Sequence, residues 1–289
     1  MKRRLIVTAD DFGASLAINE AVERAHREGI LTAASLMVGA DYARDAVQRV
    51  KRMPNLGVGL HVALTNARPV LHPERVAALV DRNGNFGGAL VRAGFRFYFS
   101  PRVRRQLEAE IKAQFEAFSA TGLPLDHVDA HNHIHVHPTV FSTIVRIGRE
   151  FGMRAMRVPS EPFRLSWIAA SNAVVMGPWV SIMRRRLQRA GIATNDAVFG
   201  LNDTGKMDEQ RILEIVERMP PGLSELYVHP ASRIAGYARS EELDALLSAR
   251  VREAIARQGI ELVTYSGMAF EALPSTSSAR SEIAPPRSG

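Results

Sequence analysis

Cysteine is absent from this 289-residue chain. Its absence excludes disulfides, thiolate zinc sites, iron–sulfur clusters and cysteine nucleophiles, so any metal must be held by histidine and carboxylate side chains. Long apolar runs are also missing, because none reaches the roughly 18 residues that a transmembrane helix needs. Acidic residues begin at Asp10, too early for a secretory signal peptide, and we therefore expect a cytoplasmic protein.

Several common enzyme motifs are missing as well. The chain has no GxSxG elbow, no Walker A loop and no GxGxxG at a strand–helix turn. These absences remove support for a serine hydrolase, a P-loop protein or a dinucleotide-binding enzyme. What is present is 46% hydrophobic and 23% charged residues, which is enough for a sizeable core.

Lysine is scarce, and the positive charge is concentrated in two arginine-rich segments. The formal net charge is +7, and 33 of the 37 basic residues are Arg. Segments 90–105 and 178–190 hold nine of these arginines and no acid, so the rest of the chain sums to −2. Such patches suit an anionic membrane surface or a polyanion, and the alternative is two solvated helix faces. We expect peripheral contact with the inner face of a membrane, and no nucleic-acid partner.

Short apolar runs alternate with helical periodicities along most of the chain. This alternation predicts a parallel α/β sheet, either open and doubly wound or closed into a barrel. One domain over residues 1–272 is expected, with an insertion near 66–100 and a disordered tail at 273–289. The eight predicted strands lie near 5–9, 32–38, 56–62, 125–130, 154–158, 193–199, 225–229 and 260–265.

Unusual polar residues follow the predicted strands at their carboxyl ends, which is the edge where parallel α/β proteins build their sites. They are Asp10, Asp11, His61, Asp129, His131, His133, Arg157 and His229.

The densest of these features is the run HVDAHNHIHVH at 127–137, which holds five of the nine histidines. In an extended chain, alternate residues share a face, so Asp129, His131 and His133 would point the same way. Imidazole and carboxylate ligands suit a divalent transition metal, and three protein ligands are sufficient for a catalytic site. A histidine-rich surface turn is the alternative.

The other residues are ambiguous when taken one by one. Asp10 and Asp11 could be a base and a metal ligand, or acids at a helix N-terminus. His61 and His229 could equally be structural histidines, and Arg157 could form an internal ion pair. Together the residues suit metal-assisted hydrolysis. Phosphoester hydrolysis uses the same ligand types, but two-metal sites need more bridging carboxylates than the chain offers.

Four motifs resemble those of the YdjC-like carbohydrate deacetylases, with order and spacing that agree over residues 4–270. This resemblance implies a distorted (β/α) barrel of about seven to eight parallel strands, as in polysaccharide deacetylases. It also implies removal of acetyl groups from N-acetylglucosamine-type sugars with one divalent metal ion, zinc or magnesium. The motifs are TADDFG at 8–13, GLH at 59–61, HVDAHNHIH at 127–135 and ELYVHP at 225–230.

Within the family, the chain looks most like the branch associated with hopanoid biosynthesis. That likeness implies a lipid-linked substrate, N-acetylglucosaminyl bacteriohopanetetrol, and free chito-oligosaccharides are the alternative. The likeness rests on segments 90–97, 102–106, 115–118, 122–127, 194–196 and 199–200.

The family pattern also assigns roles to residues. Asp11, His61 and His131 would be the metal ligands. Asp10 would be the general base that takes a proton from the attacking water, and His229 the acid that protonates the departing amine. Substrate contacts would come from residues near this centre: Arg157, which could instead orient the base, His133 and Asp129.

Overall fold

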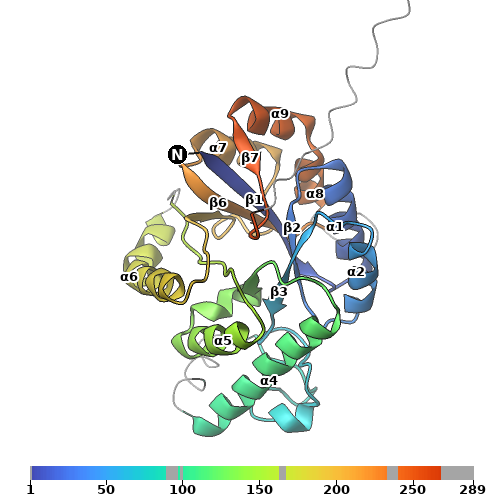
Figure 1. Ribbon diagram of the computed structural model, residues 1–289, viewed down its shortest axis with the longest axis vertical. Helices are drawn as coiled ribbons and strands as arrows, with labels where there is room; N and C mark the ends of the chain where they lie inside the picture. The colour runs from blue at the N-terminus through green and yellow to red at the C-terminus, as the bar shows by residue number, and fades with distance from the viewer. Residues whose placement is uncertain (1, 89–96, 98–99, 163–166, 233–239, 268–289) are drawn as a thin grey trace, which may run out of the picture.

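Seven parallel strands form the centre of the computed structural model, which describes residues 2–88, 97, 100–162, 167–232 and 240–267 (Figure 1). The path of the sheet is β4-β3-β2-β1-β6-β5, and β7 pairs with the first residues of β1. The strands are β1 (Arg3–Phe12), β2 (Ala33–Leu36), β3 (Gly57–Val62), β4 (Val128–Ala130), β5 (Ala197–Phe199), β6 (Gly222–Val228) and β7 (Ile260–Leu262).

The sheet curves round as a distorted barrel, which confirms the predicted fold class. Isolated parallel bridges, Val128↔Met156 and Ala155↔Ala193, connect β4 through residues 154–157 to the chain leading into β5. The expected strand at 154–158 is therefore wrong in its extent, because only Ala155 and Met156 make bridges there. Short pairings of this kind leave the barrel irregular on that side.

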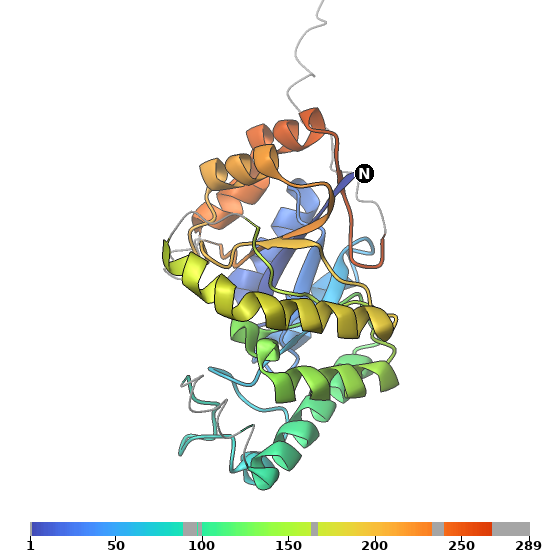
Figure 2. The same ribbon diagram turned by 90° about the vertical axis from the view of Figure 1, so that its left-hand side faces the viewer.

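Helices surround the sheet, and α4, α5 and α6 lie together on one side of it (Figures 1 and 2). Two of them begin at serine caps, because Ser15 and Ser100 each accept a hydrogen bond from a backbone N–H of the first turn. The helices are α1 (Leu16–Glu28), α2 (Ala43–Val50), α4 (Pro101–Ala120), α5 (Pro138–Glu150), α6 (Trp167–Arg189), α7 (Glu209–Arg218), α8 (Ser240–Leu247) and α9 (Ala249–Arg257).

The core fills the space between sheet and helices. Every residue of β2 and β3 is buried, as expected of parallel strands covered on both faces. The largest fully buried side chains include Phe12, Phe115, Phe141 and Phe199, but the largest of all is Arg157. A wholly buried cation at the centre of the barrel must be paired, and its partners lie at the candidate site.

The predicted insertion is only partly within the described residues. It contains a 3-10 helix, η1 (Pro73–Val76), and an antiparallel bridge between Val80 and Phe86. The tail at 273–289 lies outside the described residues, as do Arg92 and Arg96 of the first arginine-rich segment. Among the helices in the described part of the chain, none is both long and apolar enough to cross a membrane.

Candidate active site

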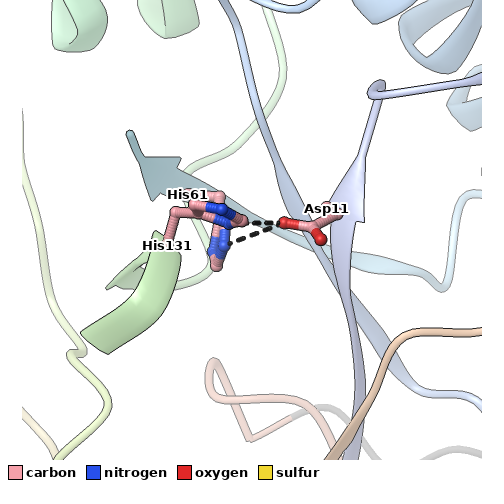
Figure 3. A group of neighbouring side chains, drawn as sticks. All are labelled: Asp11, His61 and His131. Atoms are coloured by element: carbon pink, nitrogen blue, oxygen red, sulfur yellow. Dashed lines mark hydrogen bonds and ion pairs between the residues drawn. The ribbon is translucent and has the colours of Figure 1, made fainter. Parts of the chain in front are cut away.

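Three side chains from separate strand ends meet at the carboxyl edge of the sheet (Figure 3). Asp11 is next to last in β1, His61 is next to last in β3, and His131 directly follows β4. The Asp11 carboxylate points toward both imidazole rings. We call Asp11, His61 and His131 the ligand trio.

The ligand atoms of the trio converge on one oxygen. Asp11 Oδ1 lies 2.8 Å from His131 Nδ1 and 3.5 Å from His61 Nε2. The two imidazole rings are 5.6 Å apart between centroids and nearly perpendicular. The His61 side chain is 1% exposed, whereas Asp11 and His131 are 13% and 18% exposed. The trio is therefore buried on its His61 side and reaches solvent on the other.

The backbone of Asp11 explains how two adjacent aspartates serve different partners. Asp11 has φ 62°, in the left-handed region, and the register of β1 against β2 shifts between Ala9 and Phe12. Such a bulge re-aims side chains at a strand end, and aspartate tolerates the left-handed conformation better than most residues. Asp10 and Asp11 therefore face different partners because a bulge at the end of β1 turns their side chains apart.

His61 is held by a second carboxylate behind it. Asp129 Oδ1 lies 2.8 Å from His61 Nδ1, and Asp129 Oδ2 accepts a hydrogen bond from Ser35 Oγ at 3.0 Å. A carboxylate on Nδ1 favours the tautomer with its proton there, so that Nε2 can offer its lone pair to a metal once it is deprotonated. Gly59, two residues before His61 in β3, leaves room for the His127 ring, because a Cβ there would meet that ring at 2.5 Å.

Proton affinities in the trio follow from these contacts. Burial opposes the charged form of Asp11, but hydrogen bonds from His131 and His61 hold its pKa well below the usual value. Burial also opposes protonated His61, yet the Asp129 charge and the hydrogen bonds to Asp11 and Asp129 raise its pKa well above 6.5. Without a metal, a proton on His61 therefore neutralises part of the acidic charge.

A second group of charges lies deeper in the barrel, centred on Arg157. Its guanidinium pairs with both oxygens of Asp10 at 2.7 and 2.8 Å, with Asp129 Oδ2 at 2.8 Å and with Glu225 Oε1 at 2.8 Å. Burial disfavours the cation, but the three carboxylates, Asp10 foremost, raise the Arg157 pKa well above its usual value. We call these four residues the Arg157 network.

Among the described residues, two overlapping sets of side chains could hold a metal: Asp11, His61 and His131, or Asp10, His61 and Asp129. In the second set, both carboxylates already pair with Arg157. In the ligand trio, no arginine or lysine of the described chain pairs with Asp11, and the trio offers one carboxylate oxygen and two imidazole nitrogens. This donor set fits a divalent metal with room for further ligands.

The histidine-rich run corrects one sequence expectation. Only Val128–Ala130 is extended, and residues His131–Val136 form a 3-10 turn, η2. Asn132 and His133 have φ 53° and 52°, so the alternation of faces stops at Ala130. The prediction that Asp129, His131 and His133 share one face is therefore wrong, because the chain turns before the pattern can continue.

The remaining predicted residues lie around a buried tyrosine. His133 Nε2 is 3.0 Å from the Tyr227 hydroxyl, and the His229 ring lies edge-on to Tyr227 at 5.7 Å. Burial and the charge of Arg157 push the pKa of His133 well below 6.5, so this ring is neutral at pH 7. His229 is partly buried and its Nδ1 has no hydrogen-bond partner among the described residues. Within the described part of the chain, no contact joins His229 directly to the ligand trio.

Sequence reasoning missed Glu225, although it lay within a quoted motif. Glu225 is fully buried, pairs with Arg157 and accepts hydrogen bonds from Thr8 Oγ1 and the Tyr265 hydroxyl. A carboxylate in the otherwise apolar strand β6 signals a buried charge that needs a partner. That signal, set beside Arg157 in another predicted strand, could have identified the pair.

Comparison with known proteins places this geometry in a family. A carbohydrate deacetylase of Brevibacillus brevis is 34% identical over 91% of this chain and 98% of its own length. A carbohydrate deacetylase of Geobacillus stearothermophilus is 31% identical, covering 92% and 98%. A chitooligosaccharide deacetylase of Proteus mirabilis is 28% identical, covering 93% and 100%.

A crystallised Enterococcus faecalis protein, named for cellobiose-phosphate cleavage, shares the fold. It superposes with a TM-score of 0.74 at 24% identity, covering 93% of this chain and all of the other. The family model described as YdjC-like protein matches residues 4–257, which include all three members of the ligand trio. The predicted resemblance is confirmed at this level, and the chain belongs to the YdjC-like protein family.

Proposed function

We propose that this protein is a metal-dependent hydrolase that removes the acetyl group from an N-acetylglucosamine-type sugar. The observation that carries the proposal is the ligand trio, in which one carboxylate and two imidazoles from three strand ends converge, with no arginine or lysine of the described residues paired with Asp11. The names of the full-length relatives support a carbohydrate substrate and a deacetylation reaction.

In this proposal, Asp11, His61 and His131 hold one divalent ion, zinc or magnesium. Such an ion supplies Lewis-acid activation of water and of the amide carbonyl. Asp129 fixes the orientation of His61 by its hydrogen bond to Nδ1. The opening of the trio on the side of Asp11 and His131 gives the substrate access.

Asp10 acts as the general base that takes the proton from water as oxygen attacks the acetyl carbon. Arg157 donates to both oxygens of Asp10, so the orientation of this carboxylate toward the site is fixed. Of the two predicted roles for Arg157, orientation of the base fits this contact and its complete burial. A direct contact between Arg157 and the sugar would not explain why the guanidinium pairs with both oxygens of Asp10.

His229 acts as the general acid, which donates a proton to the departing nitrogen. When the C–N bond breaks, the departing nitrogen needs a proton to leave as an amine, and the products are acetate and the free amino sugar. The Nδ1 of His229 is unpartnered among the described residues, and its backbone N–H is fixed by Glu242 Oε2 at 2.6 Å. The residue is thereby anchored through its backbone with a ring nitrogen left free.

The test is acetate release from N,N′-diacetylchitobiose by protein loaded with zinc, magnesium, manganese or cobalt. We expect release with at least one metal, and we expect Asp10→Asn to lose about 100-fold or more in kcat while keeping its metal content. Failure of the wild type with every metal and with the glycolipid described below would contradict the function. A full rate for Asp10→Asn would remove Asp10 as the base.

The finer proposal is that the sugar is carried by a hopanoid lipid, as in N-acetylglucosaminyl bacteriohopanetetrol. Its support is the sequence likeness to the hopanoid-associated branch and the arginines that flank α5. Arg104 and Arg105 of α4 line a surface cleft of about 640 Å³ together with Arg146 of α5. Arg186 of α6 reaches Ser142 of α5 at 3.3 Å, so both arginine-rich segments border the same helix.

Such a surface suits anionic headgroups on the cytoplasmic side of a membrane, where a lipid-linked sugar would be found. Flotation with liposomes should recover the protein when anionic lipid is present and lose it as salt rises. Arg104→Gln with Arg105→Gln should weaken recovery, whereas Arg24→Gln on α1 should not. A higher kcat/KM for chitobiose than for the glycolipid, without flotation, would instead favour free chito-oligosaccharides.

A further inference from the structure

A small pocket opens beside the ligand trio and has no assigned role. His61 lines its inner end, and residues of the β2–α2 connection and of the loop after β3 form its walls. Its volume is about 210 Å³. Pockets that take drug-sized ligands measure roughly 300–1,000 Å³, so this one has room for a single small ring rather than an oligosaccharide.

Small residues, including Ala14, Gly39, Ala40 and Ala63, form much of the wall, and three exposed polar residues, Asp41, Asn66 and Arg68, also line the pocket. Asp41 Oδ1 and Arg68 Nη1 form an ion pair at 3.1 Å, with the two side chains 64% and 67% exposed. Both side chains keep further acceptor and donor atoms for a ligand.

Asn66 is the third polar group, and its backbone is unusual. It has φ 47°, in the left-handed region, next to a pocket that adjoins the candidate catalytic centre. Residues held in this region cost free energy and persist where the surroundings enforce them, often at ligand sites. Gly39 faces the same loop closely, because a Cβ there would lie 3.3 Å from the Arg68 carbonyl oxygen and 3.2 Å from Val70.

Two buried polar side chains of α4 hold this loop in place. Gln114 hydrogen-bonds both backbone groups of Ala63, at 2.9 Å to the N–H and 2.7 Å to the carbonyl. Glu110 is completely buried and accepts from the backbone N–H groups of Val70 and Leu71 at 2.8 and 3.0 Å. Gln114 also donates to Glu110 at 2.8 Å. The loop is thus clamped at both ends, which preorganises the pocket wall.

We propose that this pocket binds the sugar ring that carries the acetylated nitrogen, with Asp41, Asn66 and Arg68 as the groups that recognise its hydroxyls. The proposal rests on the proposed function, because it is that function which makes the ligand an N-acetyl amino sugar. The pocket adjoins His61, so a ring seated in it stands next to the trio.

The chemistry of the three groups matches neighbouring hydroxyls on a pyranose. The Asp41 carboxylate only accepts hydrogen bonds, the Arg68 guanidinium only donates them, and the Asn66 amide does both. A pair of ring hydroxyls, each a donor and an acceptor, can therefore be shared between the carboxylate and the guanidinium. The apolar floor of small residues suits the faces of the ring.

The variants that test this are Asp41→Asn and Arg68→Met, with Arg24→Met as the matched control. Arg24 also forms an exposed ion pair, with Glu28 at 3.0 Å on α1. Loss of a hydrogen bond to a charged group should raise KM for diacetylchitobiose by about 10-fold or more, with kcat within about twofold. The control should match the wild type. Unchanged KM in both pocket variants would overturn the proposal.

Binding without turnover separates this proposal from the proposed function. Glucosamine, the deacetylated monosaccharide, is titrated calorimetrically into metal-loaded wild type and variants. We expect wild-type binding, an increase in Kd of about 10-fold or more in Asp41→Asn and Arg68→Met, and no change in Arg24→Met. Binding that follows this pattern without acetate release would contradict the deacetylase function and keep the sugar pocket. Absent wild-type binding, or equal Kd values in all proteins, would overturn the pocket assignment.

Discussion

The ligand trio lies at the carboxyl edge of the sheet and the Arg157 network lies deeper beside it, and both contain carboxylates of barrel strands. They differ in their source of positive charge. In the Arg157 network, Asp10, Asp129 and Glu225 surround a guanidinium that is fully buried with them. In the ligand trio, the partners of the Asp11 carboxylate within the described ranges are two imidazoles, and Asp11 retains access to solvent.

This difference shows which acids are satisfied by the fold and which are left for a ligand. A buried carboxylate without a cation lowers the stability of the fold, and Arg157 offsets this effect for the three acids of the network. For Asp11, the described residues supply two imidazoles, which are groups that can bind a metal. We infer that the network is chiefly a rigid support that also holds Asp10, the proposed base, and that the trio is the metal site, with Asp129 joining the two.

Removal of the internal cation should have the largest effect. Arg157→Met leaves three buried carboxylates facing one another, and we expect a loss of roughly 3–5 kcal/mol in the free energy of unfolding. Urea denaturation measures this. The surface control Arg24→Met should lose no more than about 1 kcal/mol. A stability loss for Arg157→Met as small as that of the control would contradict the role of the network.

The trio should show the opposite behaviour, with a large effect on metal and a small one on folding. Asp11→Asn removes the anionic ligand, and zinc affinity of the purified protein should fall by about 100-fold or more. Metal-free stability should change by less than about 1.5 kcal/mol, since Asp11 is partly solvated. Calorimetric zinc titration and urea denaturation test both halves. Retention of tight zinc binding would exclude Asp11 as a ligand.

Asp129 belongs to both regions, so its variant sharpens the comparison. Asp129→Asn removes the anionic partner of His61 Nδ1, and loss of such a partner typically weakens metal binding by about 10- to 100-fold. Ser35→Ala removes only the hydroxyl on the far oxygen of Asp129 and should weaken zinc binding less. If both variants bind zinc as tightly as the wild type, the carboxylate does not orient the ligand.

The smallest expected effect comes from a buried histidine–aspartate pair next to these regions. His127 Nδ1 lies 3.0 Å from Asp126 Oδ2. Burial opposes the His127 cation, but the hydrogen bond and charge of Asp126 raise its pKa above 6.5. This stabilisation is complete below pH 6.5 and is lost as pH rises through the folded-state pKa. Urea denaturation between pH 6 and 9 should show that loss, and His127→Gln should flatten it. Equal slopes in the two proteins would contradict the pairing.

Much of the barrel could be predicted because its strands are short apolar runs and its helices begin at capping residues. Seven of the eight expected strands are present, and Ser15, a residue type that favours helix N-termini, caps α1. The strand expected at 154–158 failed because two bridges, not a ladder, occupy that position. Sequence periodicity detects apolar alternation and carries no information on how many ladder hydrogen bonds form.

The site was predictable in its residues and less so in its geometry. The convergence of Asp11, His61 and His131 agrees with the roles implied by the family pattern, and those roles stay predictions until metal is measured. The prediction that Asp129, His131 and His133 share one face was wrong, because the left-handed backbone at residues 132 and 133 turns the chain. The partnership of Arg157 with Glu225 joins residues 68 apart, a contact that no local pattern contains.

Acetate release before and after metal exchange tests the central claim most directly. The wild-type protein is stripped with a chelator and then reconstituted with one equivalent of zinc or magnesium, with diacetylchitobiose and the glycolipid as substrates. We predict that stripping abolishes acetate release, that one equivalent of metal restores it, and that Asp11→Asn is not restored. Equal rates with and without metal, or full restoration of Asp11→Asn, would contradict a metal-dependent site at the ligand trio.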